Sequence, residues 1–435
     1  MRPIKVGLLG LGTVGVGTVK ILRDNATEIS RRAGCEIMVT HAVVRNIDKA
    51  KAQGFDIELS TDASTVIDNP EIDVVCEVMG GEEPAKGYIL QAIANGKHVV
   101  TANKALIAIH GNEIFSLAQD KGVMVAFEAA VAGGIPVIKA IREGLAANRI
   151  QSVAGIINGT GNFIMTEMRD KGRAFADVLA EAQALGYAEA DPTFDVEGID
   201  AAHKLTILSS IAFGIPLKFE AVYTEGISKV SSDDVQYASE LGYNIKHLGI
   251  ARKTQRGIEM RVHPTLVPKR RLLANVDGVM NAVLVQGDAV GPTIHYGAGA
   301  GEMPTGSSVV ADIVDVARTL TADPENRVPH LAFQADQIEP LPVLASHDFE
   351  TGYFLRMQVE DRPGVLADIT AIFGKHEISI EAVIQKEPED HESVATLILL
   401  TREINEGAMN DALTALNGAP SVVGEVSRIR VETLA

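Results

Sequence analysis

The chain opens with Ile4-Lys5-Val6-Gly7-Leu8-Leu9 and continues directly into Gly10-Leu11-Gly12-Thr13-Val14-Gly15-Val16-Gly17. The first run is short, apolar and ended by glycine, which predicts a buried strand. The second run follows this strand and opens a helix, and its glycine spacing is typical of a dinucleotide-binding turn. In such a turn Gly10 allows the sharp bend, Gly12 lets the backbone approach a pyrophosphate, and Gly15 lets the helix pack closely on the strand.

The residues around this turn refine the prediction. We expect the N–H groups near Thr13 and Val14 to face cofactor phosphates, because a helix N-terminus carries free donors and a positive dipole end. The next expected strand ends at Arg45, with Asp48 just beyond it. An acidic residue here usually binds the ribose 2′-hydroxyl of NAD, whereas an arginine accommodates the 2′-phosphate of NADP. Arg45 therefore favours NADP, and NAD stays possible through Asp48.

Strands and helices alternate through the first third of the chain. We expect strands at 36–44, 74–78, 99–101 and 123–128, and helices at 14–26 and 88–95. This alternation predicts a doubly wound parallel sheet, a Rossmann-like domain over residues 1–130.

A glycine-rich break at 132–136 predicts a hinge into a second domain, residues 131–320. Helices at 137–144 and 307–320, with strands at 153–157, 257–264 and 283–287, predict an α+β domain with a mixed sheet. We expect its last helix to return to the first domain. The proline-rich span 321–349 predicts a linker, and residues 350–435 follow the order strand, helix, strand, strand, helix, strand, which suits one small domain.

Bulk composition narrows the class of protein. The 435 residues are 46% hydrophobic and carry a net charge of −18, which argues against disorder and against binding of nucleic acid or an anionic membrane. The two cysteines are too few for a disulfide framework or a zinc cluster and fit a reducing compartment. No apolar run is long enough to cross a membrane, so we expect a cytoplasmic protein.

A run of acidic residues around position 190, followed by a lysine, indicates a candidate site for proton transfer. It begins Gly186-Tyr187-Ala188-Glu189-Ala190-Asp191-Pro192 and continues to Asp195, Asp200 and Lys204. Asp200 and Lys204 are four residues apart, so they would share one face of a helix. A lysine beside carboxylates and partly removed from water has a tunable pKa and can exchange a proton with an oxygen. From spacing alone, a solvent-exposed ion pair is an equal alternative.

A further lysine follows an expected strand in Thr101-Ala102-Asn103-Lys104. Ligands of open α/β sheets bind at the carboxyl ends of the strands, so Thr101 and Lys104 would lie near the cofactor or substrate. A solvated surface lysine is the alternative.

In combination, these motifs resemble the homoserine dehydrogenase family. The glycine loop, 101–104, Asn158-Gly159-Thr160-Gly161-Asn162-Phe163-Ile164, 186–192 and 195–204 occur in that family's order over residues 1 to 320. The resemblance implies oxidation of the primary alcohol of L-homoserine to L-aspartate 4-semialdehyde, or the reverse, with NAD(P). This reaction supports threonine, methionine and isoleucine biosynthesis.

The resemblance also implies roles for individual residues. Lys204 would protonate the aldehyde oxygen during reduction and act as the base during oxidation, with Lys104 beside the nicotinamide and the substrate. Glu189 and Asp200, with Asp195 in the same block, would bind the ammonium and hydroxyl groups of homoserine. These roles agree with the chemistry of the residues, because carboxylates match an ammonium and a developing alkoxide needs a positive proton donor.

Two further groups of residues gain roles from the resemblance. Gly186 and the glycine stretch 297–303, which includes Gly301, would line the cofactor. A monovalent cation such as sodium would lie near the domain junction and be held mostly by backbone carbonyls, at Glu128, Val131, Gly133 and Ile135.

The last 86 or so residues resemble an ACT domain. The turn Asp361-Arg362-Pro363-Gly364-Val365-Leu366 is typical of that domain; Asp361 can cap the following helix and Pro363 suits its first turn. The resemblance implies an amino-acid effector, usually threonine, bound at the interface of paired domains by residues 362–364 and 378–383. A dimerising appendage without a ligand is the alternative.

Two other functions fit parts of the pattern. One is a different dehydrogenase acting on an amino-acid-like aldehyde, and the other is a non-catalytic sensor that only binds NAD(P) and an amino acid. The presence of Glu189, Asp200 and Lys204 argues against the sensor. Apolar faces in the second domain predict a homodimer or homotetramer.

Overall fold

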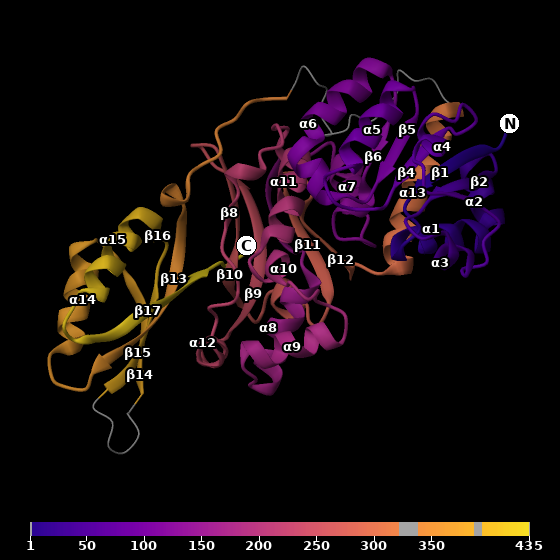
Figure 1. Ribbon diagram of the computed structural model, residues 1–435. Coiled ribbons are helices and arrows are strands. Elements are labelled where there is room, and N and C mark those ends of the chain that lie inside the picture. Colours follow the sequence, from indigo (N-terminus) through magenta and orange to yellow (C-terminus); the bar gives the residue numbers. More distant parts are fainter. Residues whose placement is uncertain (1, 322–337, 387–393, 435) are drawn as a thin grey trace.

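The computed structural model describes residues 2–321, 338–386 and 394–434. Figure 1 shows three parts along the chain: an indigo and purple α/β unit, a magenta and orange central sheet with helices, and a yellow C-terminal unit. None of the helices in these ranges combines the length and apolar character needed to span a bilayer.

The first unit is built on a parallel sheet. Its strands are β1 (Ile4–Leu9), β2 (Ile37–Val43), β3 (Glu58–Ser60), β4 (Val74–Glu77), β5 (His98–Thr101) and β6 (Val125–Ala126). They are ordered β3-β2-β1-β4-β5-β6, with every neighbouring pair parallel. The predicted doubly wound parallel sheet is confirmed. The sequence analysis missed β3, because three residues with one apolar side chain show no periodicity.

Helices connect the strands of this sheet. They are α1 (Thr13–Asp24), α2 (Ala26–Ala33), α3 (Ile47–Lys51), α4 (Ser64–Ile67), α5 (Ala85–Ala94) and α6 (Lys104–Lys121). The helix expected over 14–26 is present as α1, but it ends two residues earlier than expected: the chain breaks at Asn25 (φ −108°, ψ 17°) and a second helix, α2, begins. Asparagine competes with the helical backbone through its own side chain, so it favours helix ends over interiors.

The strands of the central unit and of the C-terminal unit form one sheet of eleven strands. The central strands are β7 (Ile150–Ile156), β8 (Tyr223–Thr224), β9 (Tyr243–Lys253), β10 (Ile258–Pro268), β11 (Met280–Gly287) and β12 (Gly291–Ala298). The C-terminal strands are β13 (Glu350–Glu360), β14 (Ile380–Lys386), β15 (Val394–Thr401), β16 (Ile404–Asn405) and β17 (Val422–Val431). Nine of the eleven strands follow one another in the main order β12-β11-β7-β9-β10-β17-β13-β15-β14, and the other two, β8 and β16, pair with β10 and β13.

The mixed sheet was predicted, but three of its central strands were not. The sequence analysis gave no strand at the two-residue β8, at β9 or at β12. In β9 the polar residues Asn244, Lys246 and His247 are buried between apolar ones, which hides both an alternating and a continuous apolar pattern. The residues 297 and 298, expected to lie in a cofactor-lining glycine loop, instead end β12.

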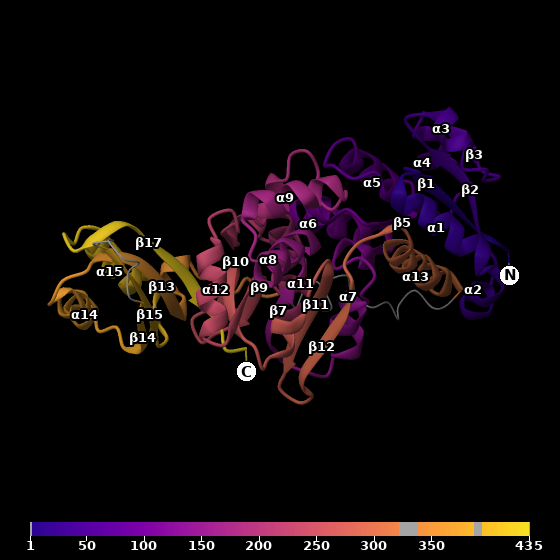
Figure 2. The same ribbon diagram turned by 90° about the horizontal axis from the view of Figure 1, so that it is seen from below.

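Helices cover one face of the central strands, as Figure 2 shows for α8, α9 and α11. The helices of this part are α7 (Val137–Lys139), α8 (Gly159–Lys171), α9 (Phe175–Ala184), α10 (Thr193–Val196), α11 (Ile199–Phe213), α12 (Ser232–Glu240) and α13 (Glu302–Thr321). The short 3-10 helices are η1 (Glu128–Ala130), η3 (Phe219–Ala221), η4 (Leu272–Asn275) and η7 (Ser346–Asp348), and the π-helix η2 (Ala140–Gly144) continues α7. Every residue of α11 except Ile199 is buried, so this helix forms the centre of the molecule.

Helix α13 packs on the first unit although it follows the central strands in the sequence. Val309, Ile313 and Val316 are fully buried in the same apolar cluster as Val6 and Leu8 of β1. The helices α1 and α13 approach so closely that a methyl group on Gly17 would lie 2.1 Å from the Glu302 carbonyl oxygen. The chain therefore crosses between the two units twice, once near the 132–136 break and once before α13.

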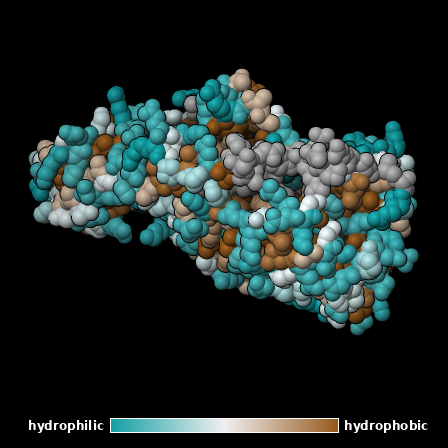
Figure 3. Space-filling view, turned by 90° about the horizontal axis from the view of Figure 1, so that it is seen from above, coloured by the Kyte–Doolittle hydropathy of each residue, from teal (hydrophilic) through white to brown (hydrophobic). Residues whose placement is uncertain are grey.

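The C-terminal unit has the order β13, α14 (Val365–Lys375), β14, β15, α15 (Glu406–Asn417), β17. The expected βαββαβ order is confirmed, with the short β16 added. Strand β17 pairs in parallel with β10, and this pairing joins the C-terminal strands to the central strands in one continuous sheet. Figure 3 shows hydrophilic residues spread over one face of the whole molecule, with apolar patches between them.

The predicted linker, 321–349, falls partly outside the described residues, which omit 322–337. The described remainder contacts the central unit. The backbone carbonyl of Pro342 accepts a hydrogen bond from the N–H of Ile258 at 2.8 Å, and Val343 forms a bridge with the same residue.

Candidate active site

The candidate site centres on helix α11, which begins after Gly198 in a left-handed conformation (φ +82°). One turn into this helix, Lys204 Nζ donates a hydrogen bond of 2.7 Å to Asp200 Oδ2. The same ammonium donates to the carbonyl of Ile157, also at 2.7 Å, just beyond the end of β7. Both side chains are almost fully buried, at 11% and 7% exposed. The pair is therefore part of the interior and not a solvated helix face.

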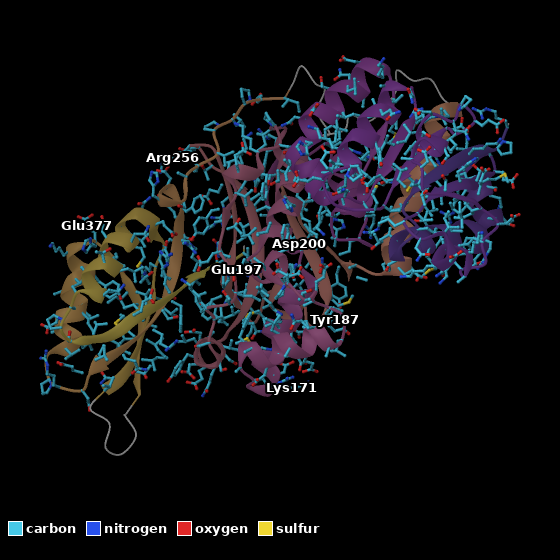
Figure 4. All side chains as sticks on the ribbon, viewed as in Figure 1. Lys171, Tyr187, Glu197, Asp200, Arg256 and Glu377 are labelled. Atoms are coloured by element: carbon cyan, nitrogen blue, oxygen red, sulfur yellow. The ribbon has the colours of Figure 1, made fainter. Side chains whose placement is uncertain are left out.

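A second lysine reaches the same carboxylate from the first unit. Lys104 starts α6, directly after β5, and its Nζ lies 2.9 Å from Asp200 Oδ1. The preceding residue, Asn103, caps α6 by accepting the Leu106 N–H, and this fixes where Lys104 leaves the helix. Asp200 thus bridges two ammonium groups that come from different units of the fold. Figure 4 shows Asp200 near the middle of the molecule.

Asn158 connects this cluster to a second carboxylate. Its Nδ2 donates to Asp200 Oδ2 at 2.9 Å and to Asp195 Oδ1 at 2.8 Å. Its Oδ1 accepts the Gly161 N–H and caps α8. The sequence analysis quoted Asn158 within a motif but assigned it no function. An asparagine followed by glycines ahead of a helix is a signal for a cap, but only the fold reveals the two carboxylates beside it.

Burial and charge shift the pKa values of these groups in opposite directions. Burial raises the pKa of Asp200, but the positive charges of Lys204 and Lys104 outweigh it, so the net pKa is below its usual value. Burial lowers the pKa of Lys204 and the charge of Lys104 adds to this, against the attraction of Asp200. The attraction of Asp200 raises the pKa of Lys104. Of the two lysines, Lys204 therefore loses its proton more readily.

The remaining acidic residues lie toward the surface of the site. Asp195 is half-buried, and burial raises its pKa against the hydrogen bond from Asn158. Glu189 is exposed on the loop after α9, yet its charge contributes to the raised pKa of Lys104. This loop is fastened by Thr160, whose hydroxyl donates to the Tyr187 carbonyl at 2.6 Å. Gly186, at the start of the loop, is exposed and left-handed (φ +76°).

The glycine turn after β1 has the geometry that a dinucleotide requires. Gly10 has φ +107°, and a methyl group on Gly15 would lie 2.5 Å from the Gly10 carbonyl oxygen. Among the described residues, nothing lies within 4 Å of the position of a methyl group on Gly12, so the described structure leaves space in front of the turn. In the part of the chain that the structure describes, α1 has no side-chain cap, so the first N–H groups, at Thr13 and Val14, are available to phosphates. These residues fit NAD(P).

Glu77, at the end of β4, is a buried residue that the sequence analysis missed. Its Oε1 accepts the N–H groups of Met79 and Gly80, and its Oε2 accepts the Thr101 hydroxyl at 2.7 Å. Glu77 thereby shapes the loop beside the glycine turn and orients Thr101. In the sequence, Glu77 is only one charged residue at the end of an apolar run, and this pattern does not indicate a role for its carboxylate.

The other expected cofactor residues lie at two places. Arg45 is exposed just after β2. Gly301, with φ +129°, directly precedes α13, the helix that packs on α1. Both therefore belong to the surroundings of the first sheet.

The four positions expected to hold a cation lie around η1 and the 132–136 break. The Glu128 carboxylate is buried and accepts the N–H groups of Ile138 and Lys139, and burial with the nearby charge of Asp312 raises its pKa to about 7. The Glu128 carbonyl accepts the Val131 N–H. Within the described ranges, no three side chains of His, Cys, Asp or Glu gather as a metal site. A cation here would depend on backbone oxygens.

Comparison with known proteins decides the family. The family model "Homoserine dehydrogenase" matches residues 136–314, "Homoserine dehydrogenase, NAD binding domain" matches 10–128, and "ACT domain" matches 353–420. A homoserine dehydrogenase of Pseudomonas aeruginosa is 62% identical over 434 residues, covering 100% of both chains. This chain belongs to the homoserine dehydrogenase family.

Solved structures agree with this membership. A homoserine dehydrogenase from Thiobacillus denitrificans superposes with a TM-score of 0.96 at 64% identity, covering 100% of this chain and 99% of that one. A hyperthermophilic archaeal homoserine dehydrogenase in complex with NADPH has a TM-score of 0.63 at 26% identity, and covers 74% of this chain and 99% of its own. The chain is thus an oxidoreductase of this family with an NAD-binding domain and an ACT domain.

The role of Asn158 predicts a measurable stability effect. Replacing Asn158 by alanine removes the cap of α8 and two hydrogen bonds to carboxylates, and should lower the stability of the protein by about 2–4 kcal/mol. Asn46→Ala is the matched control, because Asn46 caps the exposed helix α3 by accepting only the Lys49 N–H; it should cost about 1 kcal/mol. Calorimetric unfolding measures both, and equal decreases in midpoint temperature would contradict the assigned role.

Proposed function

We propose that the protein interconverts L-homoserine and L-aspartate 4-semialdehyde with NADP, with NAD as the alternative cofactor. The observation that carries this proposal is the buried cluster in which Asp200 holds Lys204 and Lys104. The family membership supports the choice of substrate. We further propose that the reaction serves threonine, methionine and isoleucine biosynthesis in the cytoplasm.

The proposed chemistry of Lys204 follows from its charge and position. When NADPH is bound, it supplies the hydride that reduces the aldehyde. The carbonyl oxygen gains negative charge in this step and needs a proton donor. We assign that proton to Lys204 Nζ, which Asp200 and the Ile157 carbonyl hold in place. In the oxidation direction the neutral amine accepts the hydroxyl proton, and its lowered pKa makes this form available at less alkaline pH.

The carboxylates are assigned to the amino-acid end of the substrate. Glu189 and Asp195 lie toward the solvent side of the cluster and carry the negative charge that an ammonium requires. Asp200 already accepts hydrogen bonds from Lys204 and Asn158 and pairs with Lys104. We therefore assign it mainly to holding the two lysines, with contact to the substrate hydroxyl as its expected second role. Lys104, the more exposed lysine, would lie beside the substrate and nicotinamide.

Loss of the Lys204 ammonium tests this mechanism. Lys204→Met should lower kcat by about 10²–10⁴-fold, because it removes the ammonium to which the proton transfer is assigned. Absorbance at 340 nm with homoserine and NADP measures turnover, and quenching of NADPH fluorescence should show that the cofactor still binds. Lys86→Met is the control, since Lys86 pairs with Glu113 in the first unit. Full turnover by Lys204→Met would refute the mechanism, and a parent protein without turnover would favour the non-catalytic sensor.

The proposed preference for NADP rests on Arg45, whose guanidinium matches a 2′-phosphate. The solved archaeal relative in complex with NADPH supports it.

Exchange of this arginine gives a direct test. Arg45→Gln should raise KM for NADP by about 10- to 100-fold, because a charge-assisted hydrogen bond contributes about 1.5–3 kcal/mol, and should leave KM for NAD nearly unchanged. Arg149→Gln is the control, because Arg149 is also an exposed arginine but pairs with Asp288, away from the first sheet. Equal changes in both cofactor constants would contradict this assignment.

We propose two further ligands. A monovalent cation such as sodium would be held by backbone oxygens at Glu128, Val131, Gly133 and Ile135. Threonine would bind the C-terminal unit at residues 362–364 and 378–383 when two such units pair, in a homodimer or homotetramer. The ACT match supports an amino-acid effector.

The effector proposal is tested at Gly364. This residue is left-handed (φ +96°) where the turn enters α14, so a side chain would distort the turn. Added threonine should lower the rate of the parent protein, and Gly364→Val should remove this inhibition. Gly374→Ala, in open space within the same helix, should retain it. If threonine did not change the rate of the parent protein, the proposed feedback control would be contradicted. Light scattering would measure the oligomeric state.

A further inference from the structure

A buried arginine of the C-terminal unit reaches into the central unit. Arg430 of β17 is 1% exposed and forms a two-pronged ion pair with Glu406 of α15. Its remaining donors cross the boundary: Nη1 donates to Glu225 at 2.6 Å, and Nη2 donates to the Tyr223 hydroxyl at 3.0 Å. The guanidinium also stacks over the Tyr223 ring, 4.8 Å from its centroid. One side chain therefore ties β8 and the residue after it to the C-terminal unit.

The segment held by Arg430 packs against the turn that precedes helix α11. The Ile227 N–H donates to the Val196 carbonyl at 2.8 Å, and His247 bonds the Glu225 carbonyl through Nε2 at 2.9 Å. A methyl group on Gly198 would lie 3.1 Å from the side chains of both Thr224 and His247. Because Gly198 must be left-handed to start α11, these contacts determine where the helix begins.

The position at which α11 begins determines where the Lys204 ammonium lies relative to its hydrogen-bond partners. Asp200 lies two residues after Gly198, and Lys204 donates both to Asp200 on its own helix and to the Ile157 carbonyl beyond β7. A small displacement of the helix start moves one of these partners relative to the other. Displacements of about 1 Å at a reacting group lower rates by up to about 100-fold.

We propose that Arg430 is a positioning residue for Lys204, which it holds in place through Glu225, Thr224 and the Val196–Gly198 turn. The C-terminal unit thus supports the start of the catalytic helix directly. The proposal rests on the proposed function, since it concerns the same lysine.

Other ion pairs cross the same boundary without touching this turn. Arg356 of β13 donates to Asp234 of α12 at 2.7 Å, and Arg252 of β9 donates to Glu432 at 2.8 Å. Arg428 lies on the same strand as Arg430, but its side chain bonds Asn410 and Glu406, which belong to the C-terminal unit. These residues provide controls for loss of docking and for loss of an arginine in β17.

The experiment compares Glu225→Ala with Arg356→Gln and Arg428→Gln in the full chain. Glu225 is 32% exposed, so its removal leaves Arg430 paired with Glu406 and should not prevent folding. We expect kcat for homoserine oxidation to fall about tenfold in Glu225→Ala, with KM for NADP unchanged. In both controls kcat should stay within about twofold of the parent, because neither Arg356 nor Arg428 contacts the Val196–Gly198 turn, although each variant leaves a buried carboxylate, Asp234 or Glu406, with one partner fewer. Arg430→Lys keeps the positive charge but loses part of the guanidinium hydrogen bonding, so its kcat should lie between those of the parent and of Glu225→Ala.

The pH profile separates positioning from general destabilisation. The titrating groups that face Lys204 are Asp200, Lys104 and Asp195. A loosened helix start admits water, so the lowered pKa of Lys204 rises and the increase of kcat with pH moves to higher pH in Glu225→Ala. An active parent with an unchanged kcat and pH profile in Glu225→Ala would overturn the proposal, as would equal losses in the controls. An inactive parent would instead overturn the proposed function.

Discussion

The structure depends on one buried carboxylate that is shared by two lysines. Asp200 faces Lys204 from its own helix and Lys104 from the first helix turn after β5. An unpaired buried charge costs several kcal/mol, so the buried Asp200 and Lys204 require each other, and the more exposed Lys104 adds a second positive partner for Asp200. The cluster carries one more positive than negative charge before Asp195 is counted. It therefore holds the helix, the sheet edge and the domain junction in one relative arrangement.

The fold supplies this cluster with rigid supports on every side. Helix α11 is buried along nearly its whole length, Lys104 leaves from a capped helix start, and Asn158 fixes both carboxylates from the start of α8. Each of these groups lies at the end of a helix or strand, where direction is set by the backbone. Local flexibility would weaken charge-assisted hydrogen bonds that depend on short distances.

The C-terminal unit is joined to this framework by a continuous sheet. Strands β10 and β17 pair in parallel, and buried ion pairs of Arg430 and Arg261 lie beside the pairing. A unit attached in this way can transmit strain to its neighbour, because packed sheets and helices resist gradual deformation. The position of Arg430 against β8 gives such strain a short path toward α11.

The sequence by itself determined the features that depend on neighbouring residues. The glycine spacing after β1, the alternation of strands and helices, the four-residue spacing of Asp200 and Lys204, and the turn around Gly364 all follow from local rules of backbone and side-chain geometry. It could not reveal β9, whose buried polar residues disguise a strand, or the break at Asn25.

Only the tertiary structure decided which distant groups meet. The approach of Lys104 to Asp200, the two carboxylates on Asn158, the support of Thr101 by Glu77 and the pairing of β17 with β10 all join residues far apart in the chain. Such contacts depend on how whole elements pack, and their free energies exceed any local preference. The pKa shift of Lys204 follows from the same cause, because burial and two neighbouring charges exist only once the chain has folded.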